Sequence, residues 1–316
     1  MPNSYPTWTD VGNKAAVFPL QLLGFEVDFI NSVHFSNHTG YSRGWEGDVL
    51  KGEQLDKILD GLDRNELLCE VKHVLTGYIG SETFLESILK VLKAVRKYGK
   101  VRYVCDPVLG DRESISDEEG KFYVPEQLVK VYQDKLLPIA DVLTPNQFEV
   151  EQLTGIRVTT LESAKQACAV LHNMGPSLVF ITSCVFAAKE EAATDSENTI
   201  AIVASQRQDV NDTADATNAT TSLEQWILEV PIIPGRYTGT GDLCAALLLA
   251  HTARFPNDLP KAMELVSNTM QAVIERTHQS SASRSSDATK YRELRLIQSA
   301  ESILRPPNRF RARKLN

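Results

Sequence analysis

Short apolar runs alternate along this chain with longer amphipathic segments. Four runs rich in β-branched, aromatic and other apolar residues predict strands at residues 25–30, 101–105, 178–182 and 200–204. Three longer segments carry apolar residues at helical spacing and predict helices at residues 84–99, 159–175 and 258–277. Strands separated by helices are typical of βαβ units. The pattern therefore predicts an α/β fold with a mainly parallel central sheet and helices on both of its faces.

Two helix starts can be predicted from residues that cap helices. Thr159 and Glu162 have the spacing of a capping box at the start of the segment 159–175. Thr144 is the expected N-cap of a further helix before Gly155, and Gln147 would complete its capping box.

The chain is expected to form one domain over residues 1–316, because we find neither an internal repeat nor an interdomain linker. Residues 189–223 hold small polar residues around one apolar run and predict loop insertions at the surface. A mobile cover over a ligand is the alternative for these loops. The basic segment 301–316 predicts a mobile tail, and residues 1–10 form an atypical N-terminus.

The composition of the chain argues against some classes of binding partner. The 316 residues are 42% hydrophobic and 23% charged, and a formal net charge of −8 argues against a nucleic-acid partner. The longest purely apolar run, residues 243–250, is too short to cross a bilayer, so we expect no membrane partner. The five cysteines lack metal-ligand spacing, and no secretory segment precedes them. Both features favour a reducing, cytoplasmic location.

Acidic and polar side chains follow the predicted strands, where an open parallel sheet binds its ligands. Asp106 and Asp111 follow the strand at 101–105. Asn146 and Glu149 lie three residues apart at a helix start, where a phosphate or its metal would sit. Each also has a purely structural reading, because Asp106 could shape a turn and the other two could only begin a helix.

The stretch "YTGTGDLCAALLLAH", residues 237–251, joins a glycine-rich turn to a uniformly apolar helix. Gly239 and Gly241 let the backbone approach a ligand closely, and the N–H groups at the helix start offer an anion site. Asp242 has two readings here. It is either a helix cap, or a base that takes the proton of a hydroxyl attacking a phosphate.

Six stretches match the motifs of one family in order and spacing. They are "GTGD" at 239–242, "NSVHFSNHTGY" at 31–41, "LTGYIGS" at 75–81, "CDPVLGD" at 105–111, "YVPE" at 123–126 and "TPNQFE" at 144–149. The chain thereby resembles the pyridoxal kinases of the ribokinase-like superfamily over roughly residues 11–300. The resemblance implies a ribokinase-like three-layer α/β/α sandwich, with the family's first strand apparently missing.

The resemblance also implies roles for individual residues. Asp242 would be the base that activates the 5′-hydroxyl of the substrate. The anion hole would consist of Gly239, Thr240 and Gly241. ATP would be bound by Asp106, Asp111, Tyr123, Thr144, Asn146, Glu149, Thr182 and Ser183, and the metal by Asp106, Asp111 and Glu149. The pyridoxal pocket would be lined by Val33, Phe35, Thr39, Tyr78 and Asp242.

By the same resemblance, the chain would use MgATP to phosphorylate pyridoxal, pyridoxine and pyridoxamine. A monovalent cation, K⁺ or Na⁺, and a homodimer are also implied. Two alternatives stay open. The first is a related small-molecule kinase of the hydroxymethylpyrimidine type, against which the segment 31–41 argues. The second is a catalytically impaired isoform that acts as a binding subunit, against which Asp242, Asn146 and Glu149 argue.

The N-terminus departs from the family pattern. The family begins with an apolar strand and a stretch of the form SHV-x-x-GYVGN, of which only "VGN" at 11–13 survives here. A family serine that contacts the pyridine ring falls in register with Ser4. Loss of the strand would remove about 5–9 kcal/mol of apolar burial. We therefore expect reduced stability and weaker pyridoxal affinity.

Overall fold

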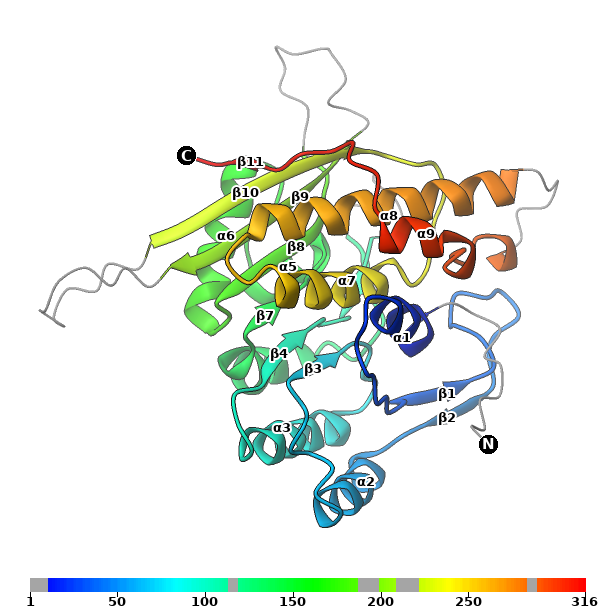
Figure 1. Cartoon of the computed structure of the whole chain (residues 1–316), viewed down its shortest axis with the longest axis vertical. Helices are drawn as coiled ribbons and strands as arrows, with labels where there is room; N and C mark the ends of the chain where they lie inside the picture. The colour runs from blue at the N-terminus through cyan, green and yellow to red at the C-terminus, as the bar shows by residue number, and fades with distance from the viewer. Residues whose placement is uncertain (1–10, 113–118, 187–198, 209–221, 283–288) are drawn as a thin grey trace, which may run out of the picture.

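The computed structural model describes residues 11–112, 119–186, 199–208, 222–282 and 289–316. Within these ranges, seven strands form a central sheet in the order β11–β10–β9–β8–β7–β4–β3 (Figure 1). The strands are β3 (His73–Thr76), β4 (Arg102–Cys105), β7 (Val142–Leu143), β8 (Leu178–Cys184), β9 (Thr199–Gln208), β10 (Ser222–Pro231) and β11 (Arg313–Lys314). Strands β3 to β8 pair in parallel and β8 to β11 antiparallel, so the predicted parallel sheet continues into an antiparallel half.

Side chains alternate between the two faces of the sheet and build a core on each. On one face, Cys105 and Leu143 join a core with helices α2 (Gly52–Arg64), α3 (Glu82–Arg96), α4 (Leu128–Val131), α5 (Gln147–Thr154) and α6 (Leu161–Met174). On the other face, Val104 and Val142 join a core with helices α1 (Asn13–Leu22), α7 (Thr240–Arg254), α8 (Leu259–Ala282) and α9 (Ala300–Leu304). Figure 1 shows α7 and α8 running side by side across the sheet. The predicted three-layer sandwich is confirmed.

Short elements connect these layers. Two small antiparallel sheets are formed by β1 (Val33–Phe35) with β2 (Gly47–Val49), and by β5 (Gly110–Asp111) with β6 (Lys121–Phe122). Single helical turns lie at η1 (Tyr132–Leu136), η2 (Leu137–Ile139), η4 (Thr289–Tyr291) and η5 (Ile297–Ser299). No described helix combines the length and the hydropathy that a membrane span needs.

Three of the four predicted strands are confirmed as β4, β8 and β9, and the fourth is wrong. Residues 25–30 form no strand. Their apolar side chains serve packing instead, since Phe25 and Val27 contact the core beneath α1 and α7 while Ile30 contacts the opposite core. An apolar run alone does not show whether an extended segment pairs with a neighbouring strand or only packs against the core.

The three predicted helices are confirmed as α3, α6 and α8, but both predicted caps are displaced. The N-cap of α6 is Thr160, whose hydroxyl accepts the backbone N–H of Ser163 at 3.1 Å. The N-cap of α5 is Asn146 and not Thr144, because the backbone stays extended through Asn146. The capping box is therefore formed by Asn146 and Glu149.

The two ends of the chain differ from each other in what the structure describes. No strand precedes α1 in the described residues, where β3 forms one edge of the sheet, and residues 1–10 with Ser4 lie outside them. The segment 301–316, expected as a mobile tail, instead adds β11 to the sheet, where Arg313 pairs with Ile227. Its apolar side chains explain the docking, because Phe310 and Leu315 pack on the two cores. The polar stretches 189–198 and 209–221 lie outside the described residues.

Candidate active site

The predicted nucleotide residues gather at the carboxyl ends of adjacent parallel strands. Asp106 follows β4, Thr144 follows β7, and Thr182 and Ser183 lie near the end of β8. The Thr144 hydroxyl donates to Asp106 Oδ1 at 3.3 Å, and the Thr182 N–H donates to the carbonyl of Pro145 at 2.9 Å. These side chains come together as predicted, because neighbouring parallel strands end at the same edge of the sheet.

Glu149 fastens the turn after β4 to the start of α5. Its Oε1 accepts the N–H of Leu109 at 2.8 Å, and its Oε2 accepts the N–H of Asn146 at 2.8 Å. Asn146 reinforces the joint, because its Nδ2 donates to the carbonyl of Gly110 at 2.8 Å. Burial raises the pKa of Glu149 to about 8 against the two backbone hydrogen bonds, which lower it. Glu149 and Asn146 together therefore hold the turn after β4 against the start of α5.

The turn from Asp106 to Asp111 is tightly constrained. Val108 adopts φ 28°, a conformation that costs energy for a β-branched residue and is often found at functional sites. At Gly110, an added Cβ would lie 2.3 Å from the carbonyl oxygen of Lys121, so only glycine fits between β5 and β6. The Tyr123 N–H donates to the carbonyl of Leu109 at 2.9 Å, which places Tyr123, 42% exposed, beside this turn.

The α7 helix begins at Thr240, and its N-cap is Gly239, which adopts φ 86°. Asp242 therefore lies in the first turn and is not the N-cap of α7. Its Oδ2 instead accepts the backbone N–H of Gly12 at 2.8 Å. Burial raises the pKa of Asp242, while the hydrogen bond from Gly12 lowers it. The first N–H groups of α7, from Thr240 and Gly241, have no intrahelical acceptor.

The start of α7 lies close to the ends of β3 and β4. A Cβ on Gly241 would lie 3.6 Å from Asp106 Oδ2, and a Cβ on Gly77 would lie 3.3 Å from Asp242 Oδ1. Burial, followed by the charges of Glu149 and Asp242, raises the pKa of Asp106 well above its usual value. Several acids therefore share one buried region, which favours a positively charged ligand.

The predicted metal residues do not form a complete cage by themselves. Within the described ranges, no three His, Cys, Asp or Glu side chains converge as a metal site. Mg²⁺ commonly binds one or two carboxylates and takes its remaining ligands from water and substrate phosphates. Asp106, whose carboxylate accepts a long hydrogen bond from Thr144, fits such a shared ion better than Glu149, whose two oxygens both accept backbone N–H groups.

The predicted pyridoxal residues lie on β1, the loop after it and the loop after β3. The Ser32 hydroxyl donates to the carbonyl of Tyr78 at 2.6 Å and joins these segments. Val33 pairs with Val49, and the ring of Phe35 packs on Trp45 with centroids 3.9 Å apart. Thr39 is exposed, and no described contact joins it to Asp242. This half of the site is therefore less completely assembled than the nucleotide half.

Four neighbours of the site were not predicted from the sequence. Gly12 contacts Asp242, Gly77 faces it, and Trp45 packs on Phe35. Arg236 donates from Nη2 to the Tyr123 hydroxyl at 3.3 Å and brings a positive charge to the same loops. Only Gly12 and Gly77 carried a sequence signal, because both lie within stretches that match the family.

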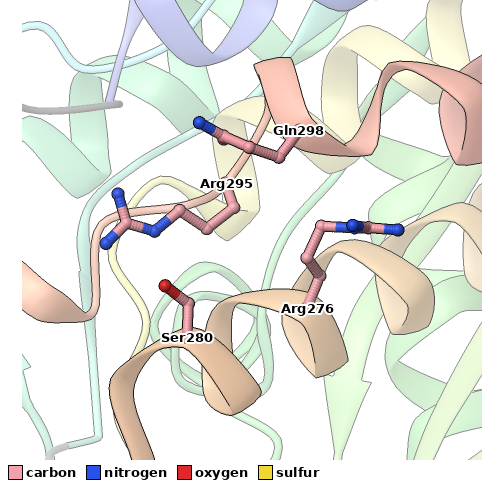
Figure 2. A pocket seen from close by; sticks show the side chains of 4 residues that line it. All are labelled: Arg276, Ser280, Arg295 and Gln298. Carbon is pink, nitrogen blue, oxygen red and sulfur yellow. The ribbon is translucent and has the colours of Figure 1, made fainter. Parts of the chain in front are cut away.

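A separate pocket of about 340 Å³ lies between α8 and the segment around η5 (Figure 2). It is lined by Arg276, Ser280, Arg295 and Gln298, none of which belongs to the predicted site. Figure 2 shows the two guanidinium groups pointing in opposite directions, so they do not converge on one anion.

Comparison with known proteins identifies the family of this chain. Residues 53–286 match the family described as phosphomethylpyrimidine kinase. A pyridoxal kinase of Arabidopsis thaliana is 45% identical over 306 residues, covering 96% of this chain and 90% of the relative. The chain belongs to the pyridoxal kinase family. The pyridoxal kinase of Homo sapiens is 39% identical over 303 residues, covering 94% of this chain and 91% of that protein.

The fold comparison agrees. The structure of a pyridoxal kinase from Leishmania donovani in complex with ADP and pyridoxamine superposes with a TM-score of 0.83 at 32% identity, covering 98% of this chain and 96% of that one. The resemblance seen in the motifs is thereby confirmed, and the chain is a kinase of ribokinase-like fold. The phosphomethylpyrimidine kinase match begins at residue 53, after the segment 31–41 that argued for a pyridoxal kinase.

Proposed function

We propose that this chain transfers the γ-phosphoryl group of ATP to the 5′-hydroxyl of pyridoxal, pyridoxine and pyridoxamine. The observation that carries the proposal is the Asp242 carboxylate, which lies in the first turn of α7 without capping it and close to the buried Asp106. The pyridoxal kinase of Leishmania donovani, solved with ADP and pyridoxamine and with ADP and pyridoxine, supports the same substrates.

Asp242 would act as the general base. Its carboxylate takes the proton of the 5′-hydroxyl as that oxygen attacks the γ-phosphorus, and the bond to the ADP oxygen breaks. A base whose pKa is raised by burial accepts this proton more readily once ionised. The N–H groups at the start of α7, from Gly239, Thr240 and Gly241, would stabilise the charge on the transferring group.

ATP would bind along the strand ends. Thr144, Thr182 and Ser183 offer hydroxyls at the edge of the sheet, and Tyr123 lies over the turn before them. Asn146 and Glu149 would hold that turn in place. Mg²⁺ would arrive with ATP and neutralise phosphate charge, and Asp106 and Asp111 would hold it, with Glu149 behind them. Val33, Phe35, Thr39 and Tyr78 would surround the pyridine ring.

Further features follow from the family rather than from a contact in this chain. They are a K⁺ or Na⁺ ion near the phosphates, a homodimer, and a cytoplasmic location. They complete the proposed enzyme as a cytoplasmic, magnesium-dependent kinase of vitamin B6 salvage.

The decisive experiment measures ATP-dependent phosphorylation with several acceptors. Purified protein is incubated with MgATP and pyridoxal, pyridoxine, pyridoxamine or hydroxymethylpyrimidine, and the phosphorylated product is quantified by chromatography. We expect kcat/KM for at least one B6 vitamer to exceed that for the pyrimidine. A preference for the pyrimidine would support the related kinase instead, and no turnover with any acceptor would support a binding subunit.

A further inference from the structure

The carboxylate of Asp242 is held by a residue 230 positions away in the sequence. Gly12 immediately precedes α1, and its backbone N–H donates to Asp242 Oδ2 at 2.8 Å. As the N-cap, Gly12 has an N–H that lies outside the hydrogen bonds of its own helix. Its carbonyl accepts the N–H groups of Ala15 and Ala16, both at 3.0 Å. The peptide that contacts Asp242 is therefore fixed by the first turn of α1.

Helices α1 and α7 pack directly on each other, which fixes the direction of this N–H. Ala15 and Ala16 are buried in the same core as Leu243 and Leu247 of α7. Small side chains on α1 allow the two helices to approach closely. The apolar packing of α1 on α7 therefore fixes the position of the Gly12 N–H relative to the Asp242 carboxylate.

The two oxygens of Asp242 have different surroundings. Oδ2 accepts the Gly12 N–H, whereas Oδ1 faces Gly77, where an added Cβ would lie only 3.3 Å away. Gly77 directly precedes Tyr78, a residue of the proposed pyridoxal pocket. Oδ2 is therefore held by Gly12, whereas Oδ1 lies toward the loop that carries Tyr78.

We propose that Gly12 is a positioning residue for phosphoryl transfer: its N–H holds Oδ2 of Asp242 so that Oδ1 is aimed at the hydroxyl of the acceptor. The inference rests on the proposed role of Asp242 as the base. The rate of a proton transfer depends strongly on where the base lies, since a displacement of about 1 Å can lower the rate on the order of 100-fold.

The position requires glycine for a backbone reason. Gly12 adopts φ 58° and ψ −135°, a combination that side-chain-bearing residues avoid. No heavy atom lies within 4 Å of a Cβ built there, so alanine would act only by altering the backbone. Gly24, just after α1, is a matched control, because it adopts φ 90° and also has no atom within 4 Å of an added Cβ.

The test compares Gly12→Ala with Gly24→Ala in the full chain. Both variants should lower Tm by similar amounts, because both place alanine at positive φ beside the same helix. Only Gly12→Ala should lower kcat, by about tenfold or more, with KM for ATP and for pyridoxal within about twofold of the parent. If the two variants have equal kcat, the positioning role is wrong. If Gly12→Ala does not fold, Gly12→Asn takes its place, since Asn tolerates positive φ better.

A double variant separates this inference from the proposed function. In an Asp242→Asn background no base remains to be positioned, so adding Gly12→Ala should change the residual kcat by less than about twofold. If Gly12→Ala lowers kcat in the Asp242→Asn background as much as it does in the parent, the positioning role of Gly12 is wrong, while the proposed role of Asp242 as the base is unaffected. Normal turnover of Asp242→Asn alone would overturn the proposed function itself.

Discussion

The proposed nucleotide half and the proposed vitamer half of the site differ in how firmly the structure holds their residues. On the proposed nucleotide side, Glu149 is 3% exposed and Asp106 is 4% exposed. Glu149 accepts the backbone N–H groups of Leu109 and Asn146, and Asp106 accepts the hydroxyl of Thr144, all from the turns that follow β4 and β7. On the vitamer side, β1 and β2 form only a two-stranded sheet, Thr39 is exposed, and Trp45 is 40% exposed.

The difference follows from what each half must do. Phosphoryl transfer needs charges at fixed positions, and the ends of a buried sheet supply them. An aromatic ring needs mainly apolar contact, which short strands and a loop can provide. Substitutions in the nucleotide half should therefore change metal use and stability strongly, whereas those in the vitamer half should change substrate affinity modestly.

The largest effect among these comparisons is expected for Glu149→Gln. A glutamine cannot accept both backbone N–H groups, and one buried N–H left unpaired costs about 1–3 kcal/mol of stability. A group that supports metal ligands typically contributes about 10–100-fold to metal affinity. We expect a higher Mg²⁺ requirement by a factor in that range, measured by magnesium titration at fixed ATP. The control is Glu162→Gln, which removes an exposed acid from the first turn of α6. Superimposable titrations for Glu149→Gln and the parent would contradict the role.

A smaller effect is expected for Trp45→Ala in the vitamer half. The change removes the contact with Phe35, and aromatic pairs contribute about 0.5–1.5 kcal/mol. KM for pyridoxal should rise about two- to tenfold while KM for ATP stays unchanged, as steady-state kinetics with each substrate varied would show. Phe29→Ala, which changes another exposed aromatic residue (55% exposed), is the control. An equal rise in both KM values would show that the two halves are not separate.

The smallest effect on activity is expected at the other end of α7. His251 is 2% exposed, and neither of its ring nitrogens has a hydrogen-bond partner among the residues that the structure describes. Burial lowers the pKa of His251 to about 4. In the unfolded chain the imidazole of His251 binds a proton near pH 6.5, whereas in the folded chain it does so only near pH 4. Below pH 6.5 the unfolded state therefore binds more protons, so the free energy of unfolding declines as the pH falls from 6.5 to 4. The loss amounts to about 3 kcal/mol.

Replacing His251 by leucine should therefore flatten the fall in stability between pH 6.5 and 4 while leaving turnover at neutral pH unchanged. Urea unfolding across this pH range measures the effect, and His34→Gln, at an exposed position, is the control. A profile for His251→Leu that remains as steep as that of the parent would contradict the assignment.

The convergence of the strand ends that carry the proposed nucleotide residues can be predicted from the sequence, for a physical reason. Asp106, Thr144 and Thr182 each follow an apolar run, and the ends of adjacent parallel strands must meet. The capping of α5 by Asn146 could not be predicted, because Thr144, Asn146 and Gln147 all suit helix starts and only the backbone decides between them.

Other errors have the same origin, since a local pattern does not report distant partners. Phe25, Val27 and Ile30 are apolar because they pack on the cores, without a neighbouring strand to pair with among the described residues. The end of the chain was expected to be mobile because it is basic, but Phe310 and Leu315 anchor it beside β10. The contact of Gly12 with Asp242 joins residues 230 positions apart, so the local pattern around either residue does not predict that they pair.

The central claim is that Asp242 is the base of an ATP-dependent pyridoxal kinase, and one comparison tests it most directly. Formation of pyridoxal 5′-phosphate is measured for the parent and for Asp242→Asn at saturating MgATP, with ADP binding and Tm measured in parallel. We predict that the variant loses about 10²–10⁴-fold in kcat while ADP affinity and Tm stay close to those of the parent. Turnover of Asp242→Asn within about twofold of the parent would contradict the account.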